Sequence, residues 1–152
     1  MNPNNRIYAK IDLDAARHNL NAVYKLIKPD TKVIAVIKTD GYGHGAIPIA
    51  TELEPVEYLY GFAVATAEEA LQLRRHGIQK PILILGYVFP EHYPQLIEQE
   101  IRLTVFTQEM AEQLAKDAQK LNKDVLIHIK IDTGMNRIGM QAKEESVKII
   151  AQ

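Results

Sequence analysis

The chain has no cysteine, no long apolar run and almost no net charge. The absence of cysteine among 152 residues excludes disulfides and thiolate chemistry, as is typical of a reducing cytosol. With 18 basic and 19 acidic side chains, neither nucleic acid nor an anionic membrane is an expected partner. No apolar run reaches the ~18 residues of a membrane span, and the polar start lacks the apolar core of a signal peptide. We therefore expect a soluble cytoplasmic protein that acts on small molecules.

Several catalytic signatures are missing as well. The sequence contains no G-x-S-x-G elbow, no P-loop and no H-E-x-x-H motif. His18, His76 and His92 do not have metal-ligand spacing, so no metal site is expected. The adjacent Glu68 and Glu69 are interpreted as the solvated first turn of a helix.

Short β-branched runs alternate with amphipathic stretches, which is the pattern of βα units around a parallel sheet. Apolar runs such as VIAVI and ILIL predict strands covered on both faces. The repeat of roughly 20 to 25 residues is typical of a TIM barrel. The expected strands are Ile7–Ile11, Lys32–Ile37, Leu59–Val64, Ile82–Leu85, Leu103–Phe106 and Val125–Ile131, and the expected helices are Asp14–Leu26, Ala46–Leu53, Thr66–His76, Pro90–Gln99 and Thr107–Leu121. Asp12 or Asp14 is expected to cap the first helix, and Thr66, in the capping pattern Thr66-x-x-Glu69, and Thr107 are expected to cap theirs.

These elements amount to an α/β fold with about the first five βα units of a (β/α)8 barrel. A complete barrel takes ~250 residues, and the final stretch EESVKIIAQ is interpreted as a helix without a glycine, proline or cap to end it. We expect residues 1–152 to be an incomplete barrel domain of a longer protein.

The most informative segment is VIAVIKTDGYGHGA, residues 33–46. Lys38 ends an apolar strand, at the edge of the sheet where active sites of barrels lie. Apolar neighbours disfavour the charged form of a lysine, which makes the neutral amine available as a nucleophile for Schiff-base chemistry. A snorkelling lysine remains the simpler interpretation of this residue alone.

The loop after Lys38 has glycine at alternate positions, Gly41, Gly43 and Gly45. Its backbone N–H groups and the following helix start could face an anion such as phosphate. A turn that requires positive φ is the other interpretation. The loop also fits the dinucleotide fingerprint as Gly41-x-Gly43-x-x-Ala46, but the acidic residue expected at the end of the next strand is missing from GFAVAT.

A second segment, HIKIDTGMNRIGM, places charged residues at the end of another strand. Strand alternation puts His128, Lys130 and Asp132 on one face, which predicts that this face lines a solvated or functional cavity. Arg137 could bind a carboxylate or a phenolate with its fixed fork of donors. A surface loop with a structural pair between Asp132 and Arg137 is the alternative.

Together, AVIKTDGYGHGA and KIDTGMNRIGM resemble the N-terminal motifs of alanine racemases, and YAKIDLDAARHNL is similar to the start of that family. Thr39, Gly41 and Asn136 stand where the family often has alanine, alanine and glycine, and Asn136 is expected to adopt positive φ. The resemblance implies an enzyme that interconverts L-alanine and D-alanine for peptidoglycan and uses pyridoxal 5′-phosphate. It also implies a homodimer of longer chains with a complete barrel and a β-rich C-terminal domain.

Residue by residue, the resemblance implies that Lys38 holds the cofactor and acts as the base on the D-alanine side. Tyr42 would contact the cofactor phosphate. Arg137 would lie near the phenolic oxygen and the substrate carboxylate, oriented by Lys130, which is carbamylated in many members. Racemisation needs a second acid–base group on the opposite face, which the family supplies as a tyrosine of the partner subunit.

The resemblance also implies an arginine facing the pyridine nitrogen, which together with that tyrosine falls outside residues 1–152. These residues alone are therefore expected to have negligible racemase activity. A non-catalytic pyridoxal-phosphate-binding barrel protein and a serine-preferring racemase are the alternative functions.

Overall fold

A five-stranded parallel sheet organises the chain, and its strands are adjacent in space in the order in which they occur in sequence. The computed structural model describes residues 7–151. The strands of the sheet are β1 (Val33–Val36), β2 (Leu59–Val64), β3 (Ile82–Ile84), β4 (Arg102–Val105) and β5 (Ile127–Ile129). Each neighbouring pair is parallel. The expected α/β fold with a parallel barrel-type sheet is confirmed.

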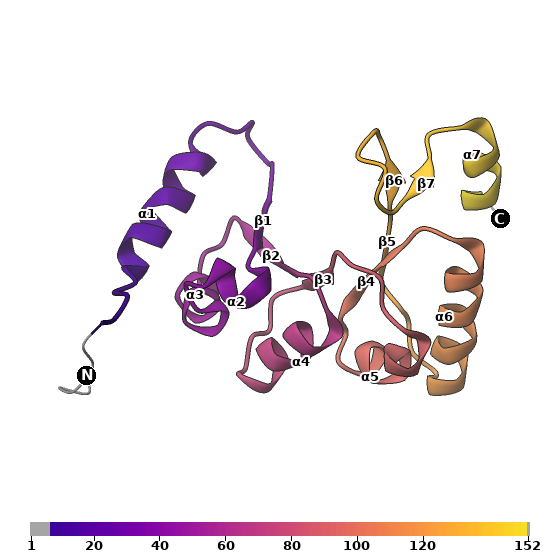
Figure 1. Ribbon diagram of the computed structural model, residues 1–152, viewed down its shortest axis with the longest axis horizontal. Helices are drawn as coiled ribbons and strands as arrows, with labels where there is room; N and C mark the ends of the chain where they lie inside the picture. Colours follow the sequence, from indigo (N-terminus) through magenta and orange to yellow (C-terminus); the bar gives the residue numbers. More distant parts are fainter. Residues whose placement is uncertain (1–6, 152) are drawn as a thin grey trace.

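Helices and turns connect these strands. They are α1 (Leu13–Tyr24), α2 (Lys38–Tyr42), α3 (Ala46–Leu53), α4 (Ala67–Arg75), a 3-10 turn η1 (Pro90–His92), α5 (Tyr93–Glu98), α6 (Gln108–Leu121) and α7 (Glu144–Ile150). Helices α3 to α6 lie along one side of the row of strands, and the two ends of the described chain lie at opposite ends of the molecule (Figure 1).

The core fills the space between that side of the sheet and the helices. Phe62 and Val64 of β2, Ile82 and Ile84 of β3 and Leu103 of β4 are fully buried there. On the other face, Ala63 and Leu83 are also buried, whereas Val36 of the first strand retains 42% of its accessible surface. This is the arrangement of a barrel wall, with helices outside and strand side chains directed inward.

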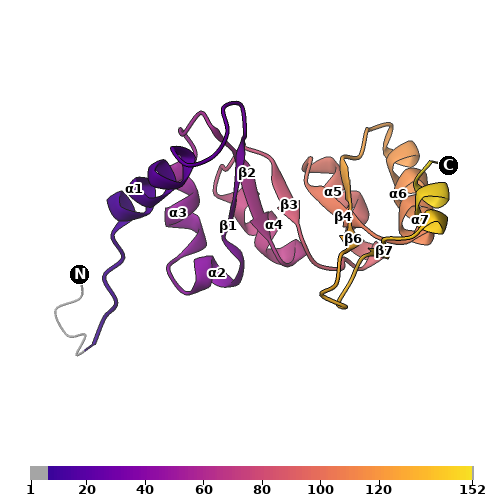
Figure 2. The same cartoon turned by 90° about the horizontal axis from the view of Figure 1, so that it is seen from above.

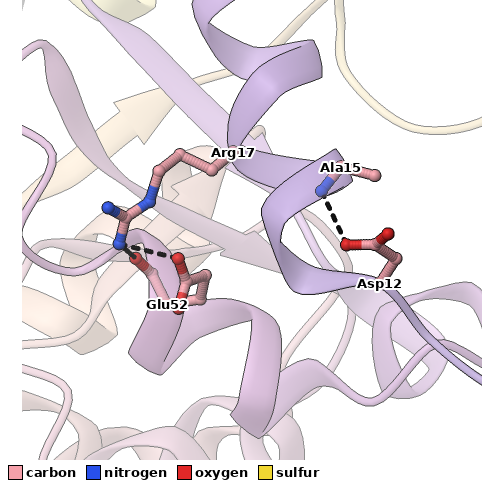
Figure 3. A network of polar contacts seen from close by, with 4 residues as sticks. All are labelled: Asp12, Ala15, Arg17 and Glu52. Carbon is pink, nitrogen blue, oxygen red and sulfur yellow. Dashed lines mark hydrogen bonds and ion pairs between the residues drawn. The ribbon is translucent and has the colours of Figure 1, made fainter.

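Local sequence signals set the helix starts. The Thr66 hydroxyl accepts from the Glu69 N–H and the Thr107 hydroxyl from the Met110 N–H, so both threonines cap their helices as predicted. Asp12 caps α1 through the Ala15 N–H at 3.0 Å, as Figure 3 shows.

Helix α1 lies at one end of the sheet and has no fully buried residue. Arg17 attaches it to α3 through an ion pair of 2.7 Å with the Glu52 carboxylate and a bond of 3.1 Å to the Glu52 carbonyl (Figure 3). Tyr24 stacks on Tyr58 with ring centroids 3.8 Å apart. These contacts, rather than deep burial, fix α1 beside α3.

The predicted strand at Ile7–Ile11 is wrong. Residues 8–12 have no regular secondary structure, and Ile7 and Tyr8 are 91% and 66% exposed. A strand needs a neighbour to pair its backbone groups, and the described sheet begins at β1. The β-branched pattern was therefore insufficient without a pairing partner.

Two other predicted elements are divided. The expected helix Pro90–Gln99 consists of η1 followed by α5. The expected strand Val125–Ile131 ends at Ile129, and β6 (Ile131–Asp132) pairs instead with β7 (Met140–Gln141). Within residues 7–151, no helix combines the length and the apolar character needed to cross a bilayer.

Candidate active site

Lys38 lies at the carboxyl end of β1, where the chain leaves the sheet and enters α2. The segment that follows is a left-handed turn, with φ of 54° at Thr39, 50° at Asp40, 62° at Gly41 and 56° at Tyr42. Left-handed backbone is unfavourable for residues with a Cβ atom, and most unfavourable for a β-branched residue such as Thr39. Such conformations cluster at functional sites, where surrounding contacts hold them in place.

The N–H groups of Gly41, Gly43 and Gly45, which were considered for anion binding, form hydrogen bonds to backbone carbonyls. Gly41 donates to the Ile37 carbonyl at 2.9 Å, and Gly43 and Gly45 both donate to the Asp40 carbonyl, at 3.1 and 2.8 Å. All three glycines have positive φ, as one interpretation of the sequence required.

Asp40 closes the start of the next helix. Its carboxylate accepts from the Ala46 N–H at 2.8 Å, so a negative charge already lies at the amino end of α3. The three glycine N–H groups and the Ala46 N–H thus have acceptors within the protein, which favours the interpretation of the loop as a turn that requires positive φ.

Tyr42 is the side chain that the turn brings to Lys38. The Lys38 ammonium lies over the Tyr42 ring, 5.1 Å from its centroid, which is a cation–π arrangement. Lys38 is half-buried, whereas Tyr42 is 57% exposed. The surroundings of the amine thus include an aromatic face as well as the apolar strand, and the tyrosine hydroxyl remains accessible to a ligand.

Glu69 is an unexpected member of this site. Its carboxylate accepts from the Thr39 N–H at 2.6 Å and from the Ala65 N–H at 2.7 Å. The interpretation of Glu69 as a solvated residue of a helix start is wrong for this reason. The capping pattern Thr66-x-x-Glu69 was visible in the sequence, but the bond to Thr39 spans 30 positions and has no local signal.

The second segment, residues 128–140, runs from the last strand of the five-stranded sheet into the two-stranded sheet of β6 and β7. Lys130 donates its N–H to the Val105 carbonyl of β4 and accepts from the Met140 N–H of β7, both at 2.8 Å. The backbone of Lys130 therefore bonds to β4 through its N–H and to β7 through its carbonyl. The Lys130 side chain is half-buried on the same side of the strand as His128.

Asp132 organises the loop that carries Arg137. Its carboxylate accepts from the N–H groups of Gly134 at 2.9 Å and Asn136 at 3.1 Å. These bonds hold the pKa of Asp132 below its usual value. Asn136 has φ of 56°, which confirms the expected positive φ.

Arg137 is exposed, and it forms no ion pair with Asp132 among residues 7–151. The predicted structural pair is therefore absent from the described part of the chain, and the Asp132 carboxylate serves the backbone instead. The guanidinium remains available to a ligand or to another part of the protein.

Both segments lie at the carboxyl ends of strands, but these strands are at opposite ends of the row. Parallel strands place all their carboxyl ends at the same edge, and Figure 2 shows α2 and the loop between β6 and β7 extending in the same direction. Lys38 and Tyr42 follow β1, whereas Lys130 and Arg137 follow β5, the other outer strand of the sheet. The structure thus brings Lys38 to Tyr42 directly, whereas Lys130 and Arg137 follow the strand at the other end of the row.

This arrangement agrees with a family match over most of the chain. Residues 11–152 match the family described as alanine racemase, N-terminal domain. The chain belongs to this family. Alanine racemase 2 of Oceanobacillus iheyensis is 49% identical over 144 residues, which cover 93% of this chain and 36% of the relative.

Solved alanine racemases show the same architecture. The enzyme of Clostridium difficile 630 in complex with cycloserine is 42% identical with a TM-score of 0.90, covering 93% of this chain and 38% of that one. A histidine racemase from Leuconostoc mesenteroides is 28% identical with a TM-score of 0.83, over 93% of this chain and 37% of that one. The chain spans between a third and two fifths of the length of these racemases.

Within the described residues, no group of three or more His, Cys, Asp or Glu side chains gathers as a metal site. The candidate side chains are an amine, a phenol and a guanidinium, of Lys38, Tyr42 and Arg137 respectively. These groups can hold a carbonyl compound covalently, donate to an anion and bind a carboxylate, respectively.

Proposed function

We propose that this chain carries the Lys38 side of the acid–base chemistry of a pyridoxal-phosphate-dependent alanine racemase, within the barrel domain to which residues 1–152 belong. The supporting observation is the Lys38 amine at the carboxyl end of β1, 5.1 Å from the centre of the Tyr42 ring. Family membership supplies the reaction class, since the relatives are alanine racemases.

The residues present fit pyridoxal 5′-phosphate. The cofactor requires an amine for its aldehyde, which Lys38 offers, and a donor for its phosphate, which the exposed Tyr42 hydroxyl offers. The glycine N–H groups of the turn are already bonded, so Tyr42 is the phosphate contact that we assign here. When bound, the cofactor supplies an electron sink for negative charge at the substrate α-carbon.

The protein then has to move a proton and hold the substrate. The Lys38 Nζ would take the α-proton from D-alanine and return it on the same face. Arg137 would bind the substrate carboxylate and lie near the phenolic oxygen of the cofactor, because its planar fork matches two oxygens. Carbamylation of Lys130 would replace a cation by an anion, which could orient Arg137 instead of repelling it.

Inversion requires a second acid–base group on the opposite face of the α-carbon. We assign this group to a tyrosine of the partner subunit in a homodimer, as the resemblance implies. The supply of D-alanine for peptidoglycan and a cytoplasmic location remain predictions of the same kind.

Alanine is the substrate proposed, because the relatives from Oceanobacillus iheyensis and Clostridium difficile 630 are alanine racemases. The histidine racemase shares the architecture of this segment, which means that the segment does not by itself select the side chain of the substrate. A serine-preferring racemase is therefore the alternative to test with the same assay.

The test is α-hydrogen exchange in deuterium oxide, with the chain and pyridoxal phosphate. We expect D-alanine to gain deuterium with retention of configuration, because Lys38 serves one face. The Lys38→Arg variant should lose the exchange, whereas Lys28→Arg, at an exposed position, should retain it. Equal exchange in Lys38→Arg would contradict the proposal.

Two further results would favour the alternative functions. A cofactor bound to Lys38 without any exchange would favour the non-catalytic binding protein. Faster exchange of D-serine than of D-alanine would favour the serine racemase.

A further inference from the structure

Glu69 connects two strand ends of the sheet through one carboxylate. It lies in the first turn of α4, directly after β2. One oxygen accepts from the N–H of Thr39, the residue after Lys38, at 2.6 Å, and the other accepts from Ala65 at 2.7 Å. A carboxylate is a fitting group for this position, because it accepts with both oxygens and donates with neither.

The bond to Thr39 holds the point at which the backbone becomes left-handed. The N–H groups of Gly41, Gly43 and Gly45 have carbonyl partners in and before the turn. The Thr39 N–H lies at the start of the turn and bonds across the sheet to Glu69 instead. Removal of this acceptor would release the residue next to Lys38 while the later bonds remain.

Glu69 does not act on the Lys38 amine by direct pairing. Among residues 7–151, no ion pair joins Glu69 to Lys38. The Lys38 amine lies over the Tyr42 ring instead. The contact that links Glu69 to the neighbourhood of Lys38 is therefore its hydrogen bond to the backbone of Thr39.

We propose that Glu69 is a positioning residue for Lys38: its carboxylate fixes the backbone where Lys38 leaves β1 and thereby fixes the place of the amine. The inference deepens the proposed function and rests on it, because the positioned amine is the one that would hold the cofactor.

Glu69→Gln tests the carboxylate with little change of shape. The amide has one accepting oxygen and a donating NH2 group, so one of the two N–H groups at Thr39 and Ala65 would face a donor. Glu68→Gln is the matched control, because Glu68 is exposed in the same helical turn and carries the same charge. Both variants remove one negative charge from the first turn of α4.

The first measurement is the pyridoxal phosphate concentration that half-labels Lys38 after borohydride reduction and peptide mapping. We expect Glu69→Gln to need about 10-fold more, which corresponds to ~1.4 kcal/mol, and Glu68→Gln to remain within about 2-fold. Labelling of Glu69→Gln at the wild-type concentration would overturn the inference.

The second measurement does not involve the cofactor. Backbone hydrogen exchange should accelerate at Thr39 and Ala65 in Glu69→Gln and stay unchanged in Glu68→Gln. Acetylation of Lys38 should accelerate as well, because a loosened turn moves the amine away from the Tyr42 ring. Exposed Lys28 provides the internal reference.

The outcomes separate the two proposals. If the wild-type chain takes no label at Lys38, the proposed function fails, and exchange and acetylation decide the role of Glu69. If exchange accelerates throughout α6 as well, Glu69→Gln has lost the fold, and the residue is a general stabiliser rather than a positioning residue. Faster exchange at Thr39 with unchanged acetylation and labelling of Lys38 also overturns the inference.

Discussion

The left-handed turn after Lys38 makes a quantitative prediction about Thr39. A residue with a Cβ atom in left-handed conformation costs about 1–2 kcal/mol, and asparagine tolerates this conformation better than other residues with a Cβ atom. Thr39 has φ of 54° and an exposed side chain, and its N–H bond to Glu69 involves only the backbone. Thr39→Asn should therefore raise the free energy of unfolding by about 1 kcal/mol, which corresponds to ~2–4 °C in Tm for a chain of this size.

The assay is urea unfolding followed by circular dichroism, with the slope checked to be unchanged between variants. Thr51→Asn is the control, because Thr51 is exposed in α3 and is absent from the positive-φ positions. Threonine and asparagine have similar helix propensity, so the control should change stability by only a few tenths of a kcal/mol. If Thr39→Asn is no more stable than Thr51→Asn, the turn is not strained at Thr39.

Three other predictions concern the packing around the site. Tyr93 is fully buried and its hydroxyl has no hydrogen-bond partner among the described residues. Tyr93→Phe should therefore raise the free energy of unfolding, measured by thermal unfolding, by about 1–3 kcal/mol. A lower Tm of the variant would contradict this. Gly139 has φ of 138°, and a Cβ there would lie 2.6 Å from the Asp132 nitrogen. Gly139→Ala should therefore lower the free energy of unfolding in urea by at least about 1–3 kcal/mol. An unchanged free energy of unfolding would show that the loop adjusts freely. Burial, and to a smaller extent the Arg102 charge, lower the pKa of His128 below 6.5 in the folded chain. The unfolded chain therefore binds more protons, and the free energy of unfolding should fall as pH drops below ~6.5. His128→Gln should make this fall less steep, and an identical pH profile of the variant would refute the prediction.

Short-range signals in the sequence were sufficient to predict much of the fold. Thr66 and Thr107 cap their helices as predicted, and of the two candidates Asp12 and Asp14 it is Asp12 that caps α1, since a cap depends on residues three positions away. β2 and α3 have the predicted bounds. The strand predicted at Ile7–Ile11 failed because pairing depends on a neighbour that lies far away in sequence.

The candidate site was predictable in its residues but not in its contacts. The spacing of Gly41, Gly43 and Gly45 indicated backbone with positive φ. No local pattern indicated that Thr39 and Asp40 would also have positive φ. Asp40 had no role assigned from the sequence, and its bond to Ala46 occupies one of the N–H groups that the suggested anion site would use. The contact of Glu69 with Thr39 depends on the register of β1 against β2, which no spacing in the sequence encodes.

The most direct test of the central claim is covalent trapping of the cofactor on the chain. The protein is incubated with pyridoxal 5′-phosphate, reduced with borohydride, digested and mapped by mass spectrometry. The account predicts that the peptide containing Lys38 carries the reduced label at cofactor concentrations that leave the other lysines unmodified. Label distributed evenly over the exposed lysines, or absent from Lys38, would contradict it.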